Sequence, residues 1–328
     1  MNGMSYQTER ANTKENVRPA RKALRALTRL FVPPYQPKRP ARKVAIVVPL
    51  STRPALLPEE EVSLRHLRHF LGAYDKYLIA PAGASIQRDG FNTIHFPRKF
   101  FGSLAAHARI GFWPPFYEAF QDYEYILIYH LDALVFSDEL MQWCDAGWDY
   151  IGAPWLPCSD TPWVKQPAVG NGGFTLMKVE SSLRALNNRY RDDPLTYWAD
   201  LLTSNGHRLT PVFRMLEKLK QRFPHARVVQ WPLERWEKSE NPARYGLNND
   251  FFWAFHAVRY LPSFKVAPVD AALQFAFEGS PRMCFELNKQ RLPFGCHAWA
   301  RYDRAFWEQF LLRGSERQMT TVQIDSSR

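Results

Sequence analysis

Short apolar runs and amphipathic segments alternate along this chain. The amphipathic segments place apolar side chains at helical spacing, as in 58–71 and 180–191. The apolar runs are typical of strands buried on both faces of a sheet, and they cover 44–50, 76–80, 93–96, 125–130 and 174–178. This alternation predicts an α/β fold with a mixed, mainly parallel sheet flanked by helices.

The pattern is less regular in the second half of the sequence. Residues 212–223 have the pattern of a basic helix, and Asn248 and Asp250 stand at the expected start of another helix. Two further apolar runs, 264–269 and 273–278, predict late strands.

The run from Tyr125 to Phe136 is expected to be central to the sheet. It is apolar apart from His130 and Asp132, which are separated by one leucine and would share a face of a strand. A buried carboxylate needs a cation, a hydrogen-bond donor or an open cleft beside it. Because clefts in parallel sheets lie at the carboxyl ends of the strands, Asp132 is predicted to enter an active site there.

A divalent cation is one partner that would suit this carboxylate. Mg²⁺ and Mn²⁺ bind few carboxylates together with phosphate oxygens, so His130 and Asp132 are candidates for holding a metal ion and a diphosphate. His297 is a further candidate ligand, because neutral imidazole binds Mn²⁺ well. The alternatives are a locally satisfied polar pair and an ordinary core histidine among aromatic residues.

Two other polar motifs have both a functional and a structural interpretation. Glycines surround Asn171 at 170–173, where they permit positive φ and a close approach of the backbone to a ligand, or form an ordinary hairpin turn. Asp250 follows two asparagines at a helix start, where it could act as a general base or simply cap the helix.

The charge of the chain is concentrated in its N-terminal arm. The formal net charge is +11, and residues 1–43 contain eleven Lys and Arg but only two acidic residues. The remainder is nearly balanced, with 32 basic and 30 acidic residues. A nucleic-acid-binding body would carry its own basic stripe, so we do not expect nucleic acid as a partner.

The arm itself divides into two parts. Residues 18–31 have the pattern of a short basic amphipathic helix, which could lie on an anionic membrane surface or pack on a partner. Four prolines between 33 and 40 predict a stiff linker. The expected domains are therefore an arm at 1–42, one catalytic domain at 43–315 and a tail at 316–328.

The chain is expected to be cytoplasmic and peripheral at the inner membrane face. Its apolar runs are too short to span a bilayer, and no signal peptide is visible. No two of its four cysteines have C-x-x-C spacing, so a structural zinc site is not expected.

Five sequence blocks, taken in order, resemble a GT-A glycosyltransferase. They are similar to a bacterial glycosyltransferase-like family of unknown function that is often met in polysaccharide assembly. The resemblance covers roughly residues 43–310, and it rests on YILIYHLDALVF (125–136), DYIGAPW (149–155), GNGGF (170–174), NNDFFW (248–253) and PFGCHAW (293–299).

This resemblance implies a Rossmann-related GT-A fold and roles for individual residues. His130-Leu131-Asp132 stands where such enzymes have D-x-D, so Asp132 would hold the metal on the diphosphate, while His130 departs from the usual first carboxylate. Asp250 matches the acid that deprotonates the acceptor hydroxyl in inverting members, and His297 matches a late metal ligand. The donor would contact Pro49, Ser51, Thr52 and Arg53, and the sugars would lie against Trp155, Asn171, Gly172 and Gly173.

The expected activity is therefore transfer of a sugar from a nucleotide-sugar donor to a glycan or a lipid-linked glycan. We expect it to be assisted by Mn²⁺ or Mg²⁺ and to invert the anomeric centre. Charge stabilisation on the leaving diphosphate and a base near the attacking hydroxyl are what this chemistry requires. The alternatives are a non-catalytic nucleotide- or glycan-binding protein on the same fold and, as suggested by the pI of about 9.5, a nucleic-acid-binding protein.

Overall fold

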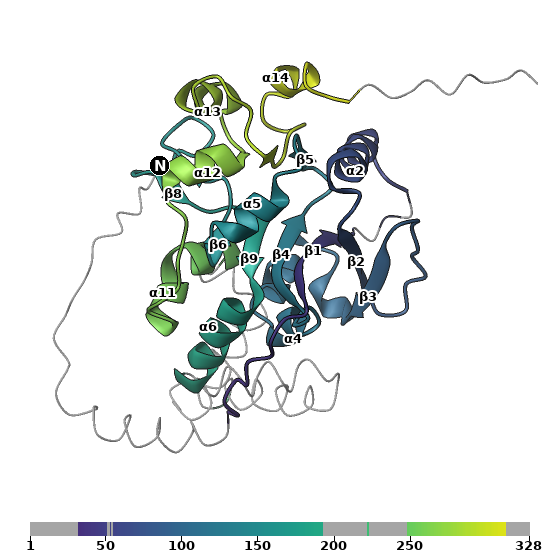
Figure 1. Cartoon of the computed structure of the whole chain (residues 1–328), viewed down its shortest axis with the longest axis vertical. Helices are drawn as coiled ribbons and strands as arrows, with labels where there is room; N and C mark the ends of the chain where they lie inside the picture. The colour runs from purple at the N-terminus through teal and green to yellow at the C-terminus, as the bar shows by residue number, and fades with distance from the viewer. Residues whose placement is uncertain (1–31, 51–52, 54, 193–221, 223–247, 313–328) are drawn as a thin grey trace, which may run out of the picture. The chain divides into compact units, whose positions relative to one another are not determined.

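The computed structural model describes residues 32–50, 53, 55–192, 222 and 248–312 (Figure 1). The chain forms two compact units. The sheet unit contains residues 42–95 and 125–177 together with the described residues from 266 to 312. The helical unit contains the described residues up to 41 together with 96–124, 178–192 and 248–265. The basic helix expected at 18–31 and the one expected at 212–223 lie outside the described residues, apart from residue 222.

A six-stranded sheet organises the sheet unit, with the strand order β3-β2-β1-β4-β9-β6 (Figure 1). β1 and β2 are parallel neighbours, with Ala45 opposite Asp75 and Pro49 opposite Ile79. β6 pairs antiparallel with β9 at one edge. The strands that follow β1 are therefore added on one side of the β1–β4 pair, and those that follow β4 are added on the other side. The bounds are β1 Arg42–Pro49, β2 Asp75–Pro81, β3 Asn92–Phe96, β4 Tyr123–Tyr129, β6 Tyr150–Ile151 and β9 Phe174–Lys178. The predicted mixed, mainly parallel sheet is confirmed.

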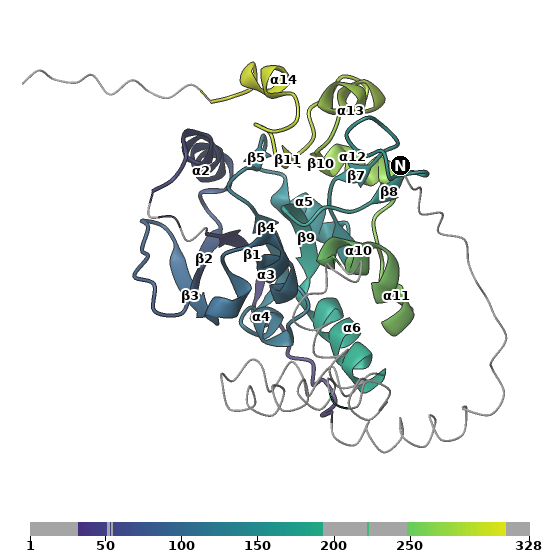
Figure 2. The same cartoon turned by 180° about the vertical axis from the view of Figure 1, so that it is seen from behind.

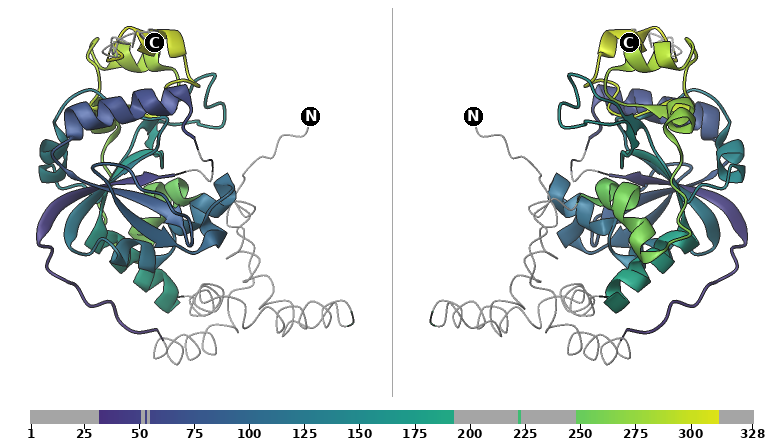
Figure 3. Two further views of the ribbon diagram at one scale, coloured as in Figure 1. Left: turned by 90° about the vertical axis from the view of Figure 1, so that its right-hand side faces the viewer. Right: turned by 90° about the vertical axis from the view of Figure 1, so that its left-hand side faces the viewer.

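Helix α2, Pro58–Leu71, makes the crossover from β1 to β2 and lies along one side of the sheet (Figure 3). Pro58 suits the first turn, where a backbone N–H would have no partner, and three glutamates follow it where the helix dipole favours acids. The Glu60 carboxylate also accepts a hydrogen bond from the Leu57 N–H at 2.8 Å. Leu64, Leu67 and Leu71 are buried in the apolar cluster that contains the sheet residues.

Short elements complete the sheet unit, most of them beyond the carboxyl end of β4, while α5 (Leu140–Asp145) packs against β1 of the main sheet (Figure 2). A small sheet has the order β10-β11-β5, in which β10 and β11 are parallel, and β7 pairs with β8. The strands are β5 Leu134–Val135, β7 Pro154–Trp155, β8 Ala168–Val169, β10 Ala276–Phe277 and β11 Gly295–Cys296. The helices are α5 Leu140–Asp145, α12 Val269–Phe275, α13 Pro281–Leu287 and α14 Arg304–Glu308.

The predicted late strands are largely wrong. Within 264–269 the structure has a single bridge, from Val266 to Tyr150, and residues 269–275 form helix α12. Pro268 precedes this helix, and Ala272 and Phe275 are buried three residues apart, which is helical spacing. Only the two residues of β10 remain as strand.

The helical unit has an aromatic core. Phe112 packs against Phe252 with ring centroids 5.2 Å apart, and Trp253 packs between Tyr117 and Phe264. The elements of this unit are η1 Arg98–Phe100, α3 Leu104–Ile110, α4 Pro114–Glu118, α6 Val179–Asp192, α10 Asn249–Phe251, η3 Phe252–His256 and α11 Ala257–Tyr260. The element η3 has π-helical hydrogen bonding, a form found mostly as short bulges and frequently at functional sites.

Residues 32–41 are extended and are held by hydrogen bonds within the helical unit. The Asn187 side chain of α6 accepts from the Tyr35 N–H and donates to the Pro33 carbonyl. Lys38 pairs with Asp122 at 2.5 Å, and the Ala41 N–H donates to the Asp122 carbonyl. The proline-rich segment is therefore anchored along its length. Among the described residues, no helix has both the length and the apolar character required to cross a membrane.

Candidate active site

His130 and Asp132 lie in a turn at the carboxyl end of β4. The strand ends at Tyr129, and the His130 carbonyl accepts the Ala133 N–H at 2.9 Å, which closes the turn. The His130 N–H donates to the Gly173 carbonyl at 2.7 Å, and the Asp132 carbonyl accepts from the Trp299 N–H at 3.1 Å. The prediction that these side chains share a face of a strand is thus wrong, because the chain turns one residue too early. The turn nevertheless directs both residues to one site.

His297 reaches the same site from the small sheet. It follows β11, and its N–H donates to the Phe277 carbonyl of β10 at 2.9 Å. Its Nε2 lies 3.2 Å from Asp132 Oδ1, and its ring centroid lies 5.4 Å from that of His130. One ligand atom from each of these three residues lies within 4.8 Å of the others. In the described part of the chain, this is the only group of three or more His, Cys, Asp or Glu side chains placed to hold a metal ion.

Gly173 makes room for the His297 ring. A Cβ atom at this position would lie 2.0 Å from His297 Nε2, which is far below any ordinary contact distance. Gly170 has a similar steric role toward the indole of Trp155, which a Cβ would approach to 2.1 Å. The glycines of the 170–173 motif are therefore required for close packing at these two positions.

Asn171 is the residue of this motif that adopts a positive φ, of 76°. Its side chain is buried, and Oδ1 accepts from the N–H groups of Gly173 at 2.6 Å and Phe174 at 3.1 Å. Its carbonyl accepts the hydroxyls of Tyr150 and Thr175. Asparagine tolerates this backbone region because its side chain bonds the following amides. The segment leads from the β7–β8 pair into β9 of the main sheet, so the hairpin alternative does not apply.

Glu278 is a member of the site that the sequence did not reveal. Its Oε1 lies 2.8 Å from His297 Nδ1, and its side chain is 19% exposed. Phe277 and Cys296 are register partners in the parallel β10–β11 pair, so Glu278 and His297 directly follow paired positions. The pairing of β10 with β11 would have suggested this contact, but two-residue strands leave no recognisable pattern in the sequence.

The site combines opposite charges in a partly buried setting. Burial would lower the pKa of His297, but the carboxylates of Asp132 and Glu278 raise the pKa to about 10. Burial would raise the pKa of Asp132, but the His297 and His130 imidazoles lower the pKa well below its usual range. The carboxylate of Asp132 is therefore ionised, and it favours a cation beside it.

Two polar atoms of this group suit a shared metal ion. Asp132 Oδ1 and His297 Nε2 are both buried, and neither makes a hydrogen bond in the structure, although they lie 3.2 Å apart. Buried polar atoms without hydrogen bonds are costly, and a metal ion that displaced the proton of His297 would bind both atoms. Two imidazoles and one carboxylate therefore fit a divalent metal, with positions left over for ligand oxygens.

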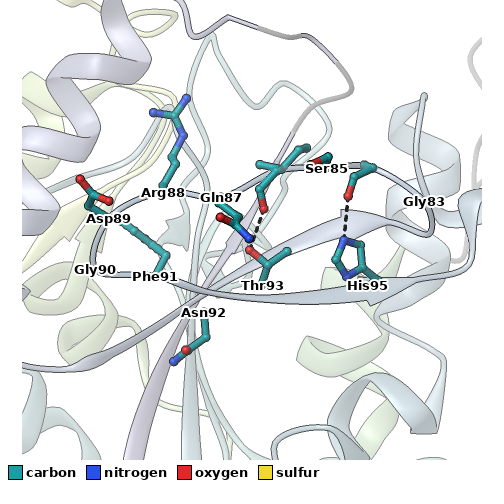
Figure 4. Close-up of a pocket in the computed structure, with 12 residues that line it drawn as sticks. Gly83, Ser85, Gln87, Arg88, Asp89, Gly90, Phe91, Asn92, Thr93 and His95 are labelled. Atoms are coloured by element: carbon teal, nitrogen blue, oxygen red, sulfur yellow. Dashed lines mark hydrogen bonds between the residues drawn. The ribbon is translucent and has the colours of Figure 1, made fainter.

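The other predicted donor contacts are only partly described. Pro49 ends β1 at the same edge of the sheet, and Arg53 pairs with Glu60 of α2 at 2.6 Å. Ser51 and Thr52 lie outside the described residues. An additional cavity of about 820 Å³ lies beyond β2, lined by residues 83–93 and His95 (Figure 4). His95 bonds the Ala84 carbonyl and Thr93 bonds the Ile86 carbonyl, which joins β3 to the loop (Figure 4).

The two tryptophans near the predicted acceptor site differ in how deeply they are buried. Trp155 is 4% exposed and packs against Gly170, whereas Trp163 in the same loop is 52% exposed. The two rings meet edge to face with centroids 5.2 Å apart. Gly172 is half-buried within the turn. Contact of these residues with a sugar stays a prediction, and Trp163 is the more exposed of the two rings.

Asp250 belongs to the helical unit, in the first turn of α10. Its Oδ1 accepts from the Phe251 N–H at 2.8 Å, and the π-helical element η3 begins two residues later. The Asn248 side chain makes no capping hydrogen bond. The role of Asp250 as a base stays a prediction.

The sequence matches the model of a family described as "Protein of unknown function (DUF5672)" over residues 90–297. This is more than half of the chain, so the chain belongs to this family. No curated protein matches it.

Two solved structures are among those with a similar shape. One is the apo-form glycosyltransferase GlyE of Streptococcus pneumoniae TIGR4, at 13% identity and a TM-score of 0.40, over 83% of this chain and 61% of that one. The chain thus spans less than two thirds of GlyE. The other is the PaToxG glycosyltransferase, at 13% identity and a TM-score of 0.25, over 68% of this chain and 94% of that one.

Proposed function

We propose that this member of the DUF5672 family transfers a sugar from a nucleotide-sugar donor, using a divalent metal held by His130, Asp132 and His297. The observation that carries the proposal is the meeting of these three side chains at the carboxyl end of β4, with Asp132 Oδ1 and His297 Nε2 lacking hydrogen bonds. Open α/β sheets bind ligands beyond the carboxyl ends of their strands, where the strand order reverses. In this sheet the reversal lies between β1 and β4.

The bound metal would supply Lewis-acid stabilisation of the charge that develops on the departing diphosphate. The residues of the chain orient the ligand around it. Asp132 would contribute an ionised carboxylate. The two imidazoles would contribute nitrogen ligands, and on His297 the metal would first displace the proton that Asp132 and Glu278 favour. Because imidazole suits transition metals better than Mg²⁺, this set favours Mn²⁺.

The nucleoside would extend along the sheet edge from this group toward β1 and β2. Strands lie about 4.8 Å apart, so β2 is roughly 10 Å from β4, a span that suits a nucleoside diphosphate. The end of β1 at Pro49 and the cavity beyond β2 lie in that direction. Polar side chains line this cavity, including Gln87, Asn92 and Thr93, which could bond a base or a ribose.

Asp250 is the proposed base for the acceptor hydroxyl, which would make the transfer inverting. A carboxylate at the start of a short helix beside a π-helical element is a reasonable place for such a group. The proposed acceptor is a glycan or a lipid-linked glycan, with Trp163 and Trp155 contributing to its site. Attachment to an anionic membrane through residues 18–31 is also a proposal, resting on the charge of that segment.

The test is release of nucleoside diphosphate from a panel of nucleotide sugars in the presence of Mn²⁺. Water can take the place of the acceptor hydroxyl as the nucleophile, so one donor should release nucleoside diphosphate above background. The Asp132→Asn variant should lose this signal, while Asp270→Asn, which changes an exposed acid in the first turn of α12, should keep it. Binding of a nucleotide without turnover of any donor would favour the non-catalytic alternative.

A further inference from the structure

The Nδ1 atom of His297 has two polar neighbours. Glu278 Oε1 lies at 2.8 Å, and Asn171 Nδ2 lies at 3.1 Å. Only one of them can accept a proton from Nδ1, because an amide NH₂ is a donor. Which atom bonds Nδ1 decides which ring nitrogen has a lone pair for a metal ion.

The orientation of the Asn171 amide is fixed by the backbone. Its Oδ1 accepts from the N–H groups of both Gly173 and Phe174, so its NH₂ group must face His297. Turning the amide by 180° would break both bonds, and it would place the NH₂ group against the N–H groups of Gly173 and Phe174, so that donors would face donors. The Glu278 carboxylate is therefore the acceptor for an Nδ1 proton.

Glu278 is well placed to hold the ring in a constant position. Its side chain is 19% exposed. Glu278 directly follows β10 and His297 directly follows β11, so the parallel pairing of these strands places the two residues side by side. The His297 N–H donates to the carbonyl of Phe277, which immediately precedes Glu278, so backbone and side chain bond the same histidine. The opposite nitrogen, Nε2, then faces Asp132 Oδ1 at 3.2 Å.

We propose that Glu278 is a positioning residue, which accepts the Nδ1 proton of His297 and so turns an unprotonated Nε2 toward the metal shared with Asp132. The inference rests on the proposed function, because it assumes that this group holds a metal. Metal-ligating histidines commonly have such a partner, which fixes the tautomer and the ring orientation. The role of Asn171 is complementary, since it offers Nδ1 no acceptor.

The test is the Mn²⁺ affinity of the full chain, measured by the electron paramagnetic resonance signal of free Mn²⁺. Removing an outer-shell partner costs metal affinity by about 10–100-fold. Glu278→Ala should lower Mn²⁺ affinity by an amount near the upper end of this range. Glu278→Gln keeps an acceptor oxygen, so its loss of affinity should lie near the lower end. Glu286→Gln is the matched control, because Glu286 is exposed on helix α13. The unfolding midpoint without metal shows that each variant is folded.

A double-mutant cycle separates positioning from direct ligation. If Glu278 acts through His297, then Glu278→Ala should cause no further loss of Mn²⁺ affinity in a His297→Ala background. Equal losses in both backgrounds would overturn the inference, and so would wild-type affinity in Glu278→Ala and Glu278→Gln. If Asp132→Asn also binds Mn²⁺ like the wild type, then the metal site of the proposed function fails as well. Loss in Asp132→Asn alone would overturn only the role of Glu278.

Discussion

The imidazole of His297 lies against the backbone of Gly173, so closely that a Cβ on this glycine would come within 2.0 Å of Nε2. The same glycine accepts the His130 N–H through its carbonyl. One residue of the 170–173 motif therefore sets the position of two of the three candidate metal ligands.

Replacing this glycine should damage the site more than the fold. In Gly173→Ala the methyl group would displace the His297 ring, and we expect Mn²⁺ affinity to fall by at least about tenfold. Titration of Mn²⁺ with a paramagnetic readout measures the loss. The circular dichroism spectrum should stay that of the wild type. Unchanged Mn²⁺ affinity would show that the ring position seen here is not needed for binding.

Metal preference follows from the ligand set. Two imidazoles and one carboxylate should bind Mn²⁺ more tightly than Mg²⁺ by at least about tenfold. Competition of Mg²⁺ against bound Mn²⁺ measures this ratio, and chelation with EDTA should abolish donor turnover until Mn²⁺ is restored. Preference for Mg²⁺ would indicate a site built from oxygen ligands, which this group is not.

Asp250 should affect turnover without affecting the metal. If it deprotonates the acceptor, Asp250→Asn should lower kcat by about 10²–10⁴-fold. Mn²⁺ affinity should be unchanged. Asp270→Asn is a close control, because Asp250 and Asp270 both lie in the first turn of a helix. Equal effects of the two changes on kcat would mean that Asp250 contributes only to its helix.

The two tryptophans of the 153–169 loop should differ in their effect on stability. Trp155 is 4% exposed and packs on Gly170, so Trp155→Ala should lower the free energy of unfolding by about 3–5 kcal/mol. Trp163 is 52% exposed, so Trp163→Ala should change that free energy by only about 0.5 kcal/mol. Denaturant unfolding of both variants is the measurement. A reversed order would contradict the packing described here.

The sequence predicted five of the six strands of the main sheet, the sheet type and three of the residues that meet at the site. This was possible because long apolar runs and an isolated polar pair are local signals, as at Tyr125–Phe136. Glu278 could not be predicted in the same way. Its contact with His297 depends on the pairing of two two-residue strands, a tertiary feature with no periodicity in the sequence.

The prediction of late strands was wrong for a related reason. Residues 264–278 contain apolar side chains at spacings that suit a strand or a short helix, and Pro268 with tertiary packing decided in favour of α12. The positive φ in the glycine motif was also placed on the wrong residue type. Asn171 adopts it because its side chain bonds two following amides, while Gly170 and Gly173 leave room for rings.

The most direct test of the central claim is the thermal stability of the full chain with a panel of nucleoside diphosphates, with and without Mn²⁺. A ligand that binds only the folded state stabilises it and so raises Tm. The free energy of unfolding increases by about 2.7 kcal/mol when the ligand concentration is a hundred times Kd. The account predicts that one nucleotide raises Tm only when Mn²⁺ is present, and that Asp132→Asn abolishes the shift while Asp270→Asn keeps it. A shift of the same size without metal, or in Asp132→Asn, would contradict a metal-held diphosphate at this group.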